Sequence, residues 1–222
     1  MTNSADSPAV DPSLNRERKP SYHHGNLREA LIEGGLELLE EYGAADLSQR
    51  LLARQLGVSQ TAPYHHFGDK NGLLAALATE GFRRSGNVLK MVSIEHLSLE
   101  RRVRGICAGY VRFAREKPEL FRLMYGTTVQ RKDEYPELVI ASTEAFEALA
   151  TRVSEMIRDF DIKHVDSRQA TTSLLALSHG LAHLIVDRRV SPILAEYIDD
   201  ERIVVEQTAK LFVRGFQPLP DS

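Results

Sequence analysis

The 222-residue sequence predicts an all-α fold. Apolar residues recur at helical spacing almost everywhere after residue 20, and hardly any segment alternates apolar and polar residues as a half-buried strand does. Glycines and prolines fall where helices are expected to end or begin. The chain is long enough for one good-sized core, or for a small domain joined to a larger one.

Composition limits the classes of function. The chain has 42% hydrophobic and 27% charged residues, as ordinary globular proteins do. A formal net charge of −3 excludes a surface that is basic throughout, so any surface for nucleic acid must be local. The one cysteine, Cys107, cannot form an intrachain disulfide, no apolar run approaches the ~20 residues of a membrane span, and no signal-peptide core is present. We therefore expect a cytoplasmic protein without membrane association.

The N-terminal elements follow from composition, apolar spacing and capping residues. Residues 1–20 are rich in Ser, Asn, Asp and Pro without periodicity, which predicts a disordered tail. A first helix, with an apolar face from Leu27 to Tyr42, should end at Gly43, because glycine suits a left-handed C-cap.

Further helix starts are marked by side chains that can cap a helix. Ser48 can cap a short second helix that closes at Gly57, Ser59 can cap a third, and Asp69 can cap a fourth that runs to about residue 87. Beyond it we expect a short helix opened by Pro118 and longer ones over about residues 99–116, 136–160, 166–189 and 199–216.

The second and third helices have the dimensions of a helix-turn-helix motif. Gly57 gives the turn its backbone freedom, Val58 fills the angle between the helices, and Ser59 caps the second of them. With Ser59 as the N-cap, Pro63 is the fourth helical residue, and its missing N–H costs one terminal hydrogen bond and does not break the helix.

Side chains suited to base edges lie at the start of this third helix. Gln60, Thr61 and Ala62 should occupy its first turn, which is the part of a recognition helix that meets the major groove. An amide can pair with adenine, and the methyl groups of Thr and Ala suit the thymine methyl.

Groups that can hold phosphate follow directly. Tyr64 and His65 can donate to phosphate oxygens, whereas Phe67 should turn inward. Lys70 lies in the first turn of the fourth helix, so a lysine and a helix N-terminus could hold one phosphate together. The alternative for Tyr64, His65 and His66 is an aromatic cluster that packs the small domain.

The stretch "LSQRLLARQLGVSQTAPYHHFGDKNGLLAAL" resembles the DNA-binding domain of TetR-family transcriptional regulators, whose pattern is close to T-x-x-x-I-A-x-x-x-G-V-S-x-x-x-x-Y-x-x-F-x-x-K-x-x-L. The chain departs from the family at Pro63, where an apolar residue such as Leu is usual. "PELFRLMYG" and "SHG" are similar to a subgroup of the family's ligand domains. The residues that match the pattern in register are Ser48, Leu52, Ala53, Gly57, Val58, Ser59, Tyr64, Phe67, Lys70 and Leu73.

The resemblance implies the organisation of the chain. It places a helix-turn-helix DNA-binding domain at residues 21–70, a connecting helix at residues 71–90, and a helical ligand-binding and dimerisation domain at residues 91–222. We count the capping residues Ser48 and Ser59 among the expected DNA contacts.

The start of the DNA-binding domain is locally basic. Residues 15–28 hold four Lys or Arg against one Glu, next to Tyr22, His23 and His24. This segment could lie along phosphates or enter a minor groove, as basic arms do, so we expect contacts from Tyr22 and His23. A solvated basic tail explains the same composition equally well.

Aromatic, Met and His residues of the C-terminal segment are candidates for a ligand pocket. Most such residues at helical spacing are simply core, but the resemblance implies a pocket between the helices. His179 and His183, four residues apart on one helix face, could anchor a ligand or hold a metal, although no H-E-x-x-H motif is present. We expect no cofactor and no metal. The predicted ligand-binding residues are Tyr110, Phe113, Phe121, Met124, Tyr125, Phe146, His179 and His183.

Two apolar stripes occupy the last two helices. They could be buried within one subunit, but the resemblance implies that they pair with their copies in a homodimer. A dimer also suits DNA, because two recognition helices related by a two-fold axis reach half-sites about 34 Å apart. The stripes are Leu174, Leu177, Leu181 and Leu184, and Val204, Thr208, Leu211 and Gly215.

The sequence therefore predicts a homodimeric regulator that binds double-stranded DNA. We expect a repressor that releases a palindromic operator when a small molecule binds the C-terminal domain. The alternative is a metal-responsive DNA-binding sensor that uses His179 and His183. A helical hydrolase using Ser178, His179 and Asp187 is disfavoured, because adjacent residues on a helix point apart and no strand-turn-helix elbow surrounds the serine. We expect no enzyme.

Overall fold

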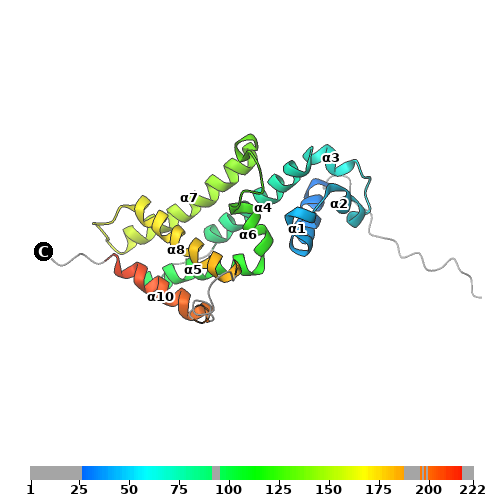
Figure 1. The fold of residues 1–222 in the computed structure, drawn as a ribbon. Helices are drawn as coiled ribbons and strands as arrows, with labels where there is room; N and C mark the ends of the chain where they lie inside the picture. Colours follow the sequence, from blue (N-terminus) through cyan, green and yellow to red (C-terminus); the bar gives the residue numbers. More distant parts are fainter. Residues whose placement is uncertain (1–26, 92–95, 188–195, 197, 199, 217–222) are drawn as a thin grey trace, which may run out of the picture.

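The structure is a computed structural model that describes residues 27–91, 96–187, 196, 198 and 200–216. Regular structure within these residues is helical throughout, which confirms the predicted all-α class (Figure 1). The elements are α1 (Leu27–Asp46), α2 (Gln49–Leu56), α3 (Ala62–Phe67), α4 (Lys70–Met91), α5 (Leu99–Glu116), α6 (Pro118–Tyr125), the 3-10 helix η1 (Lys132–Glu134), α7 (Pro136–Asp159), α8 (Ser167–Asp187) and α10 (Glu201–Arg214).

Three of the predicted caps are confirmed. Ser48 accepts a hydrogen bond from the Leu51 N–H at 3.2 Å, and Gly57 closes α2 in the left-handed conformation with φ 65°. Asp69 accepts from the Gly72 N–H at 2.8 Å at the start of α4. Gly43 leaves the helical conformation with φ 74°, as predicted, but the chain makes one more turn before α1 ends at Asp46.

The prediction that Ser59 caps the third helix is wrong. The Ala62 N–H, which such a cap would receive, bonds to the Ser59 backbone carbonyl at 3.0 Å, while the Ser59 hydroxyl lies 3.2 Å from that of Thr61. Helix α3 therefore begins at Ala62, and Pro63 is its second residue, where no N–H is needed. The proline costs no hydrogen bond, and Gln60 and Thr61 lie in the turn before the helix.

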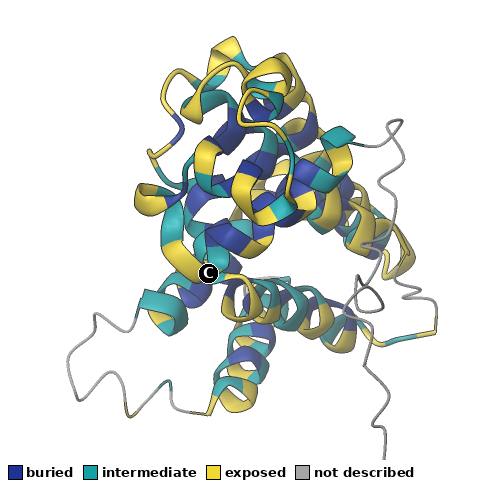
Figure 2. Cartoon of the chain, turned by 90° about the vertical axis from the view of Figure 1, so that its right-hand side faces the viewer, coloured by how far each residue is buried: buried dark blue, intermediate teal, exposed yellow. Residues whose placement is uncertain are grey.

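The helices form two buried clusters that share α6 and α7. The first cluster joins α1, α2 and α4 to buried residues of α6 and the start of α7, and the second joins α5 and α8 to α6, α7 and α10. Figure 1 shows α1, α2 and α3 grouped at one end of α4, with the remaining helices around its other end. The buried positions, dark blue in Figure 2, follow the inner faces of these helices. The domain boundaries at residues 70 and 90 stay predictions.

Glycine lets α6 approach α4 closely. A Cβ atom placed on Gly81 would lie 2.6 Å from Met124 Sδ and 3.1 Å from Leu120 Cδ1. Because Gly81 has no side chain, the Leu120 and Met124 side chains of α6 pack directly on the backbone of α4, the helix that leads to the helix-turn-helix. Within the residues that the structure describes, no helix has the length and apolar character to cross a membrane.

Candidate nucleic-acid interface

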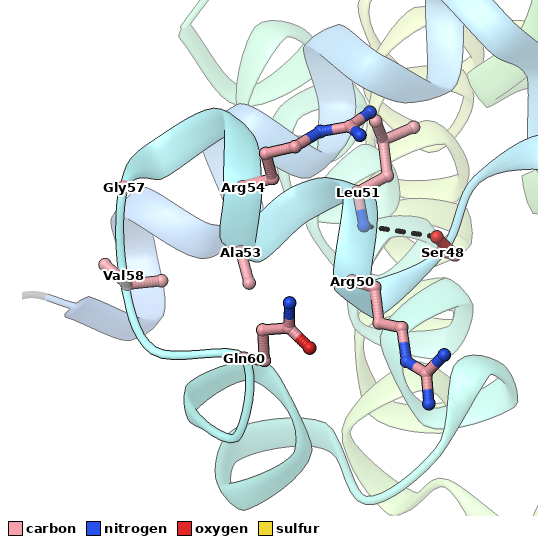
Figure 3. Close-up of a pocket in the computed structure, with 8 residues that line it drawn as sticks. All are labelled: Ser48, Arg50, Leu51, Ala53, Arg54, Gly57, Val58 and Gln60. Atoms are coloured by element: carbon pink, nitrogen blue, oxygen red, sulfur yellow. Dashed lines mark hydrogen bonds between the residues drawn. The ribbon is translucent and has the colours of Figure 1, made fainter.

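Helix α2 and the turn that follows it line a surface hollow (Figure 3). Figure 3 shows Gln60 reaching from the turn toward α2, while Arg50 and Arg54 extend from α2 in different directions. The lining of the hollow includes an amide and two arginines, whose side chains can pair with adenine, guanine and phosphate. The lining residues are Ser48, Arg50, Leu51, Ala53, Arg54, Gly57, Val58 and Gln60.

Helix α3 buries one side and exposes the other. Pro63 is buried, and Phe67 is half-buried against the first cluster, with the Arg28 guanidinium 5.9 Å from its ring centre. This agrees with the prediction that Phe67 turns inward. The residues left facing solvent include most of the predicted contacts: Gln60, Thr61, Tyr64 and His65 are exposed, and Ala62 is half-buried. The 45% exposure of Tyr64 argues against the alternative of an aromatic core cluster.

The predicted phosphate site at Lys70 has competitors within the chain. The exposed Lys70 ammonium donates to the Ala45 carbonyl near the end of α1, so one of its three donors is used. The carboxylate of Asp69 already occupies one N–H of the first turn of α4. A phosphate must therefore share the ammonium with Ala45 and can use only the remaining first-turn N–H groups.

A buried glutamine fixes the start of α2 to the start of α4. Gln49 is 2% exposed, and its Nε2 donates to the Asp69 carbonyl at 2.8 Å. Its Oε1 has no hydrogen-bond partner. Because Asp69 also caps α4, this contact sets the position of the helix-turn-helix relative to α4.

The sequence analysis missed Arg50 and Arg54. Both are exposed on α2, four residues apart and therefore on one helix face. They lie outside the recognition helix, but their spacing of four residues is a signal that the sequence carries. Tyr22 and His23, the predicted contacts of the N-terminal segment, lie outside the described residues.

A second candidate site lies where α5, α6 and α8 meet. Five of the eight predicted ligand-binding residues come together there, and we call them the ring cluster. The ring centres are 4.6 Å apart for His179 and His183, 4.7 Å for Tyr125 and His179, and 4.9 Å for Phe121 and His183. The ring cluster comprises Tyr110, Phe121, Tyr125, His179 and His183.

The other three predicted ligand-binding residues lie elsewhere. Phe113 is half-buried against both clusters, and Met124 is buried in the first cluster beside Gly81. Phe146 is 44% exposed on α7, so the prediction that it lines an interior site is wrong. Helical spacing alone did not show which face of α7 turns outward.

Hydrogen bonds connect the ring cluster to charged groups at its edge. The Tyr110 hydroxyl lies 2.8 Å from His179 Nδ1, and His183 Nδ1 lies 3.1 Å from Asp187 Oδ2. Arg122 Nε donates to Asp187 Oδ1 at 3.0 Å. Burial lowers the pKa of His179, and the neighbouring His183 lowers it further. The hydrogen bonds from His183 and Arg122 lower the pKa of Asp187.

In the described part of the chain, the side chains needed for metal binding or for serine hydrolysis are not assembled. No group of three or more His, Cys, Asp or Glu residues is placed there to hold a metal ion. The Ser178 hydroxyl is buried and donates to Cys107 Sγ at 3.4 Å, which is not the arrangement of a serine activated by His179.

Contacts from α1 and α4 hold α6 and the loop that follows it. Glu40 on α1 accepts hydrogen bonds from the N–H groups of Leu120, at 2.9 Å, and Glu119, at 3.3 Å, and so caps α6. Asn71 on α4 donates to the Gln130 carbonyl at 2.9 Å and accepts from its N–H at 3.0 Å. The helix that supplies two rings of the cluster is thus hydrogen-bonded to α1, and the loop that follows it is hydrogen-bonded to α4.

Comparison with known proteins identifies the family. Residues 31–77 match the bacterial regulatory proteins of the tetR family, and residues 103–201 match the tetracyclin repressor-like C-terminal domain. The chain belongs to the TetR family. It is therefore a DNA-binding transcriptional regulator, and the predicted family is confirmed. TetR proteins are regulators that bind DNA and small-molecule effectors and are not enzymes.

Three similar proteins illustrate the likeness. A protein with unknown function from Rhodococcus sp. RHA1 has a solved structure with a TM-score of 0.72 and 32% identity, covering 89% of this chain and 98% of its own. A tetracycline repressor protein of class C from Escherichia coli is 53% identical over 51 residues, which are 23% of each chain. A nucleoid occlusion factor SlmA from Marinomonas sp. (strain MWYL1) is 26% identical over 140 residues, 61% of this chain and 68% of that one.

Proposed function

We propose that this TetR-family regulator is a homodimeric repressor that releases a palindromic operator when a small molecule binds at the ring cluster. The proposal that this protein binds DNA through its helix-turn-helix rests on the side chains that this motif exposes to solvent. Gln60 and Thr61 face solvent, and Gln60 lines the same hollow as Arg50 and Arg54. The Gln60 amide reads base edges, while Arg54, Tyr64 and Lys70 hold phosphates and fix the register.

An unpaired apolar face supports the homodimer. On α8, Leu177 is 43% exposed and Leu184 is 37% exposed, and on α10 Ile203 and Leu211 reach 58% and 65%. The opposite faces of both helices are buried in the second cluster. Pairing α8 and α10 with their copies would cover these side chains, and two subunits would present two recognition helices to two half-sites.

The contacts of α6 support release by an effector. This helix supplies Phe121 and Tyr125 to the ring cluster, packs on Gly81 of α4, and is capped by Glu40 of α1. A molecule that binds more tightly when α6 is displaced lowers operator affinity by the ratio of its affinities for the two arrangements.

Selection of bound duplexes from a random library, followed by anisotropy titrations at two salt concentrations, tests the DNA-binding part. Tyr64→Phe and Arg54→Gln should weaken binding to all duplexes, and Arg54→Gln should also lower the salt slope by about 1, because one phosphate is no longer neutralised. Gln60→Ala should instead change the preferred base at one position of each half-site. Arg158→Gln, exposed at the far end of α7, is the matched control. Equal affinity of wild type and all three variants for every duplex would rule out this surface.

Sedimentation of Leu211→Lys tests the homodimer. Wild-type protein should sediment as a dimer and the variant as a monomer, because a charge cannot be buried unpaired between the helices. The monomer should bind a palindromic duplex more weakly and without cooperativity. A variant that still sediments as a dimer would place the subunit contact elsewhere.

A further inference from the structure

The ring cluster offers aromatic surface to a ligand. Its five rings contact one another in tilted and edge-to-face arrangements, with centres 4.6 to 6.1 Å apart. In this arrangement the rings pack against one another, so a ligand that binds among them must take the place of some of these ring–ring contacts. A flat aromatic molecule does this at the least cost, because it restores contacts of the same kind and geometry.

The cluster is reachable from solvent on one side. The side chain of His183 is 38% exposed, and those of Asp187 and Arg122 beside it are 35% and 40% exposed. Phe121, by contrast, is fully buried. A ligand would therefore enter past His183 and meet Tyr125 and His179 behind it.

Hydrogen bonds assign which imidazole nitrogens are free to meet a ligand. The Tyr110 hydroxyl pairs with both His179 Nδ1 and the Tyr125 hydroxyl. It donates to His179 Nδ1, because an imidazole nitrogen is a stronger acceptor than a phenol oxygen, and it accepts from Tyr125, so neutral His179 carries its proton on Nε2. His183 Nδ1 faces the carboxylate of Asp187, which can only accept, so neutral His183 carries its proton on Nδ1 and its Nε2 is an acceptor. Neither Nε2 has a partner among the described residues.

The free groups therefore form a donor and an acceptor on adjacent rings. A hydroxyl group both accepts and donates, so it can satisfy His179 Nε2–H and His183 Nε2 together. A carboxylate only accepts and would face the lone pair of His183, and an ammonium only donates and would face the N–H of His179. Lowering of the His179 pKa by burial keeps this ring neutral near pH 7, in agreement with the assignment.

The charge at the edge of the cluster argues against an anionic ligand. Within the part of the chain that the structure describes, Arg122 is the cation beside it, and its three nitrogens donate to Asp187 at 3.0 Å, to Glu119 at 2.6 Å and to the Val186 carbonyl at 3.3 Å. With one guanidinium and two carboxylates, this group has a net charge of −1. Among the described residues, no free cation offsets the repulsion that an acidic effector would meet there.

We infer that the effector of this protein is a phenol, an uncharged aromatic ring whose hydroxyl group bonds to His179 and His183. This inference rests on the proposal that the ring cluster is the effector site, and it names the class of molecule that the site accepts.

Fluorine NMR titration with four one-ring probes of similar size tests the class. The probes are 4-fluorophenol, 4-fluorotoluene, 4-fluorobenzoate and 4-fluorobenzylammonium, each added to the full-length protein at neutral pH. We expect 4-fluorophenol to bind about tenfold more tightly than any of the others, which corresponds to one or two net hydrogen bonds. Equal affinities, preference for the charged probes, or no binding by a folded protein would overturn the inference.

Ring-conserving variants test the site. His183→Phe keeps an aromatic ring but removes the acceptor, so the preference for 4-fluorophenol over 4-fluorotoluene should fall to about twofold or less. Tyr110→Phe removes the hydroxyl that orients His179 and should reduce the same preference. His164→Phe, at an exposed position between α7 and α8, is the matched control and should leave it intact. An undiminished preference in both His183→Phe and Tyr110→Phe would overturn the site.

The outcome is separable from that of the DNA-binding proposal, because the probes are measured without DNA. If the protein bound phenols but preferred no duplex, the proposed repressor function would be refuted and the proposed class of ligand would not. Specific operator binding with no discrimination among the probes would do the reverse.

Discussion

Removal of the Glu40 carboxylate should loosen α6 and lower the stability of the whole chain. Glu40 is half-buried and accepts two N–H groups of the first turn of α6, at 2.9 and 3.3 Å. Loss of such a cap costs about 1 kcal/mol, and loss of a negative charge at a helix N-terminus adds about 0.3 to 1 kcal/mol. We therefore expect Glu40→Ala to destabilise the protein by roughly 1.5 kcal/mol, or about 3–6 °C in the midpoint of thermal unfolding for a chain of this size.

Thermal unfolding followed by circular dichroism, at one protein concentration, measures the change. Glu40→Gln keeps one carbonyl acceptor and should lose about half as much as Glu40→Ala. Glu37→Ala, at an exposed position on the same helix, is the control and should change the midpoint by no more than about 1 °C. If Glu40→Ala and the control variant have the same unfolding midpoint, the two hydrogen bonds do not hold α6 to α1. The proposed coupling between the ring cluster and the helix-turn-helix then does not involve Glu40.

Three further outcomes follow from the structure. Because the folded-state pKa of His179 is lowered from 6.5, the unfolded chain takes up this proton first as the pH falls. The midpoint of thermal unfolding should therefore fall as the pH drops below about 6.5. The midpoint of the His179→Gln variant should fall less over the same range. Cys107 is fully buried and its pKa is raised by burial, so Ellman's reagent should react with it only after unfolding. Gly57→Ala should destabilise by about 1 kcal/mol because φ is 65°, whereas Gly105→Ala, in open space on α5, should stabilise by up to about 1 kcal/mol in chemical denaturation.

Local chemistry made much of the fold predictable. Ser48, Asp69 and Gly57 mark helix ends through hydrogen bonds and backbone angles that involve only neighbouring residues, and the structure confirms all three. The prediction from Ser59 was wrong because serine is an equally good residue for the turn itself. The better guide was Pro63, which fits the first turn of a helix wherever the cap lies.

Contacts between distant segments could not be predicted. The exposure of Phe146 depends on which face of α7 packs on α4, and periodicity leaves that choice open. The bonds from Glu40 to α6 and from Asn71 to Gln130 join residues about 80 and 59 positions apart. The ring cluster could be predicted in part. The spacing of His179 and His183 indicated that they share a helix face, but it did not indicate that Tyr110 contacts His179.

The first buried cluster has a practical consequence for engineering. It contains Leu31 and Leu73 together with Leu120, Leu123 and Leu138, so the helix-turn-helix portion of this regulator completes its hydrophobic interior with side chains encoded some 50 residues downstream. A chimaera that joins residues up to 91 to a foreign sensor would leave that interior open to water. A transplant of DNA specificity onto another sensing module should therefore carry α6 and the beginning of α7 along with it.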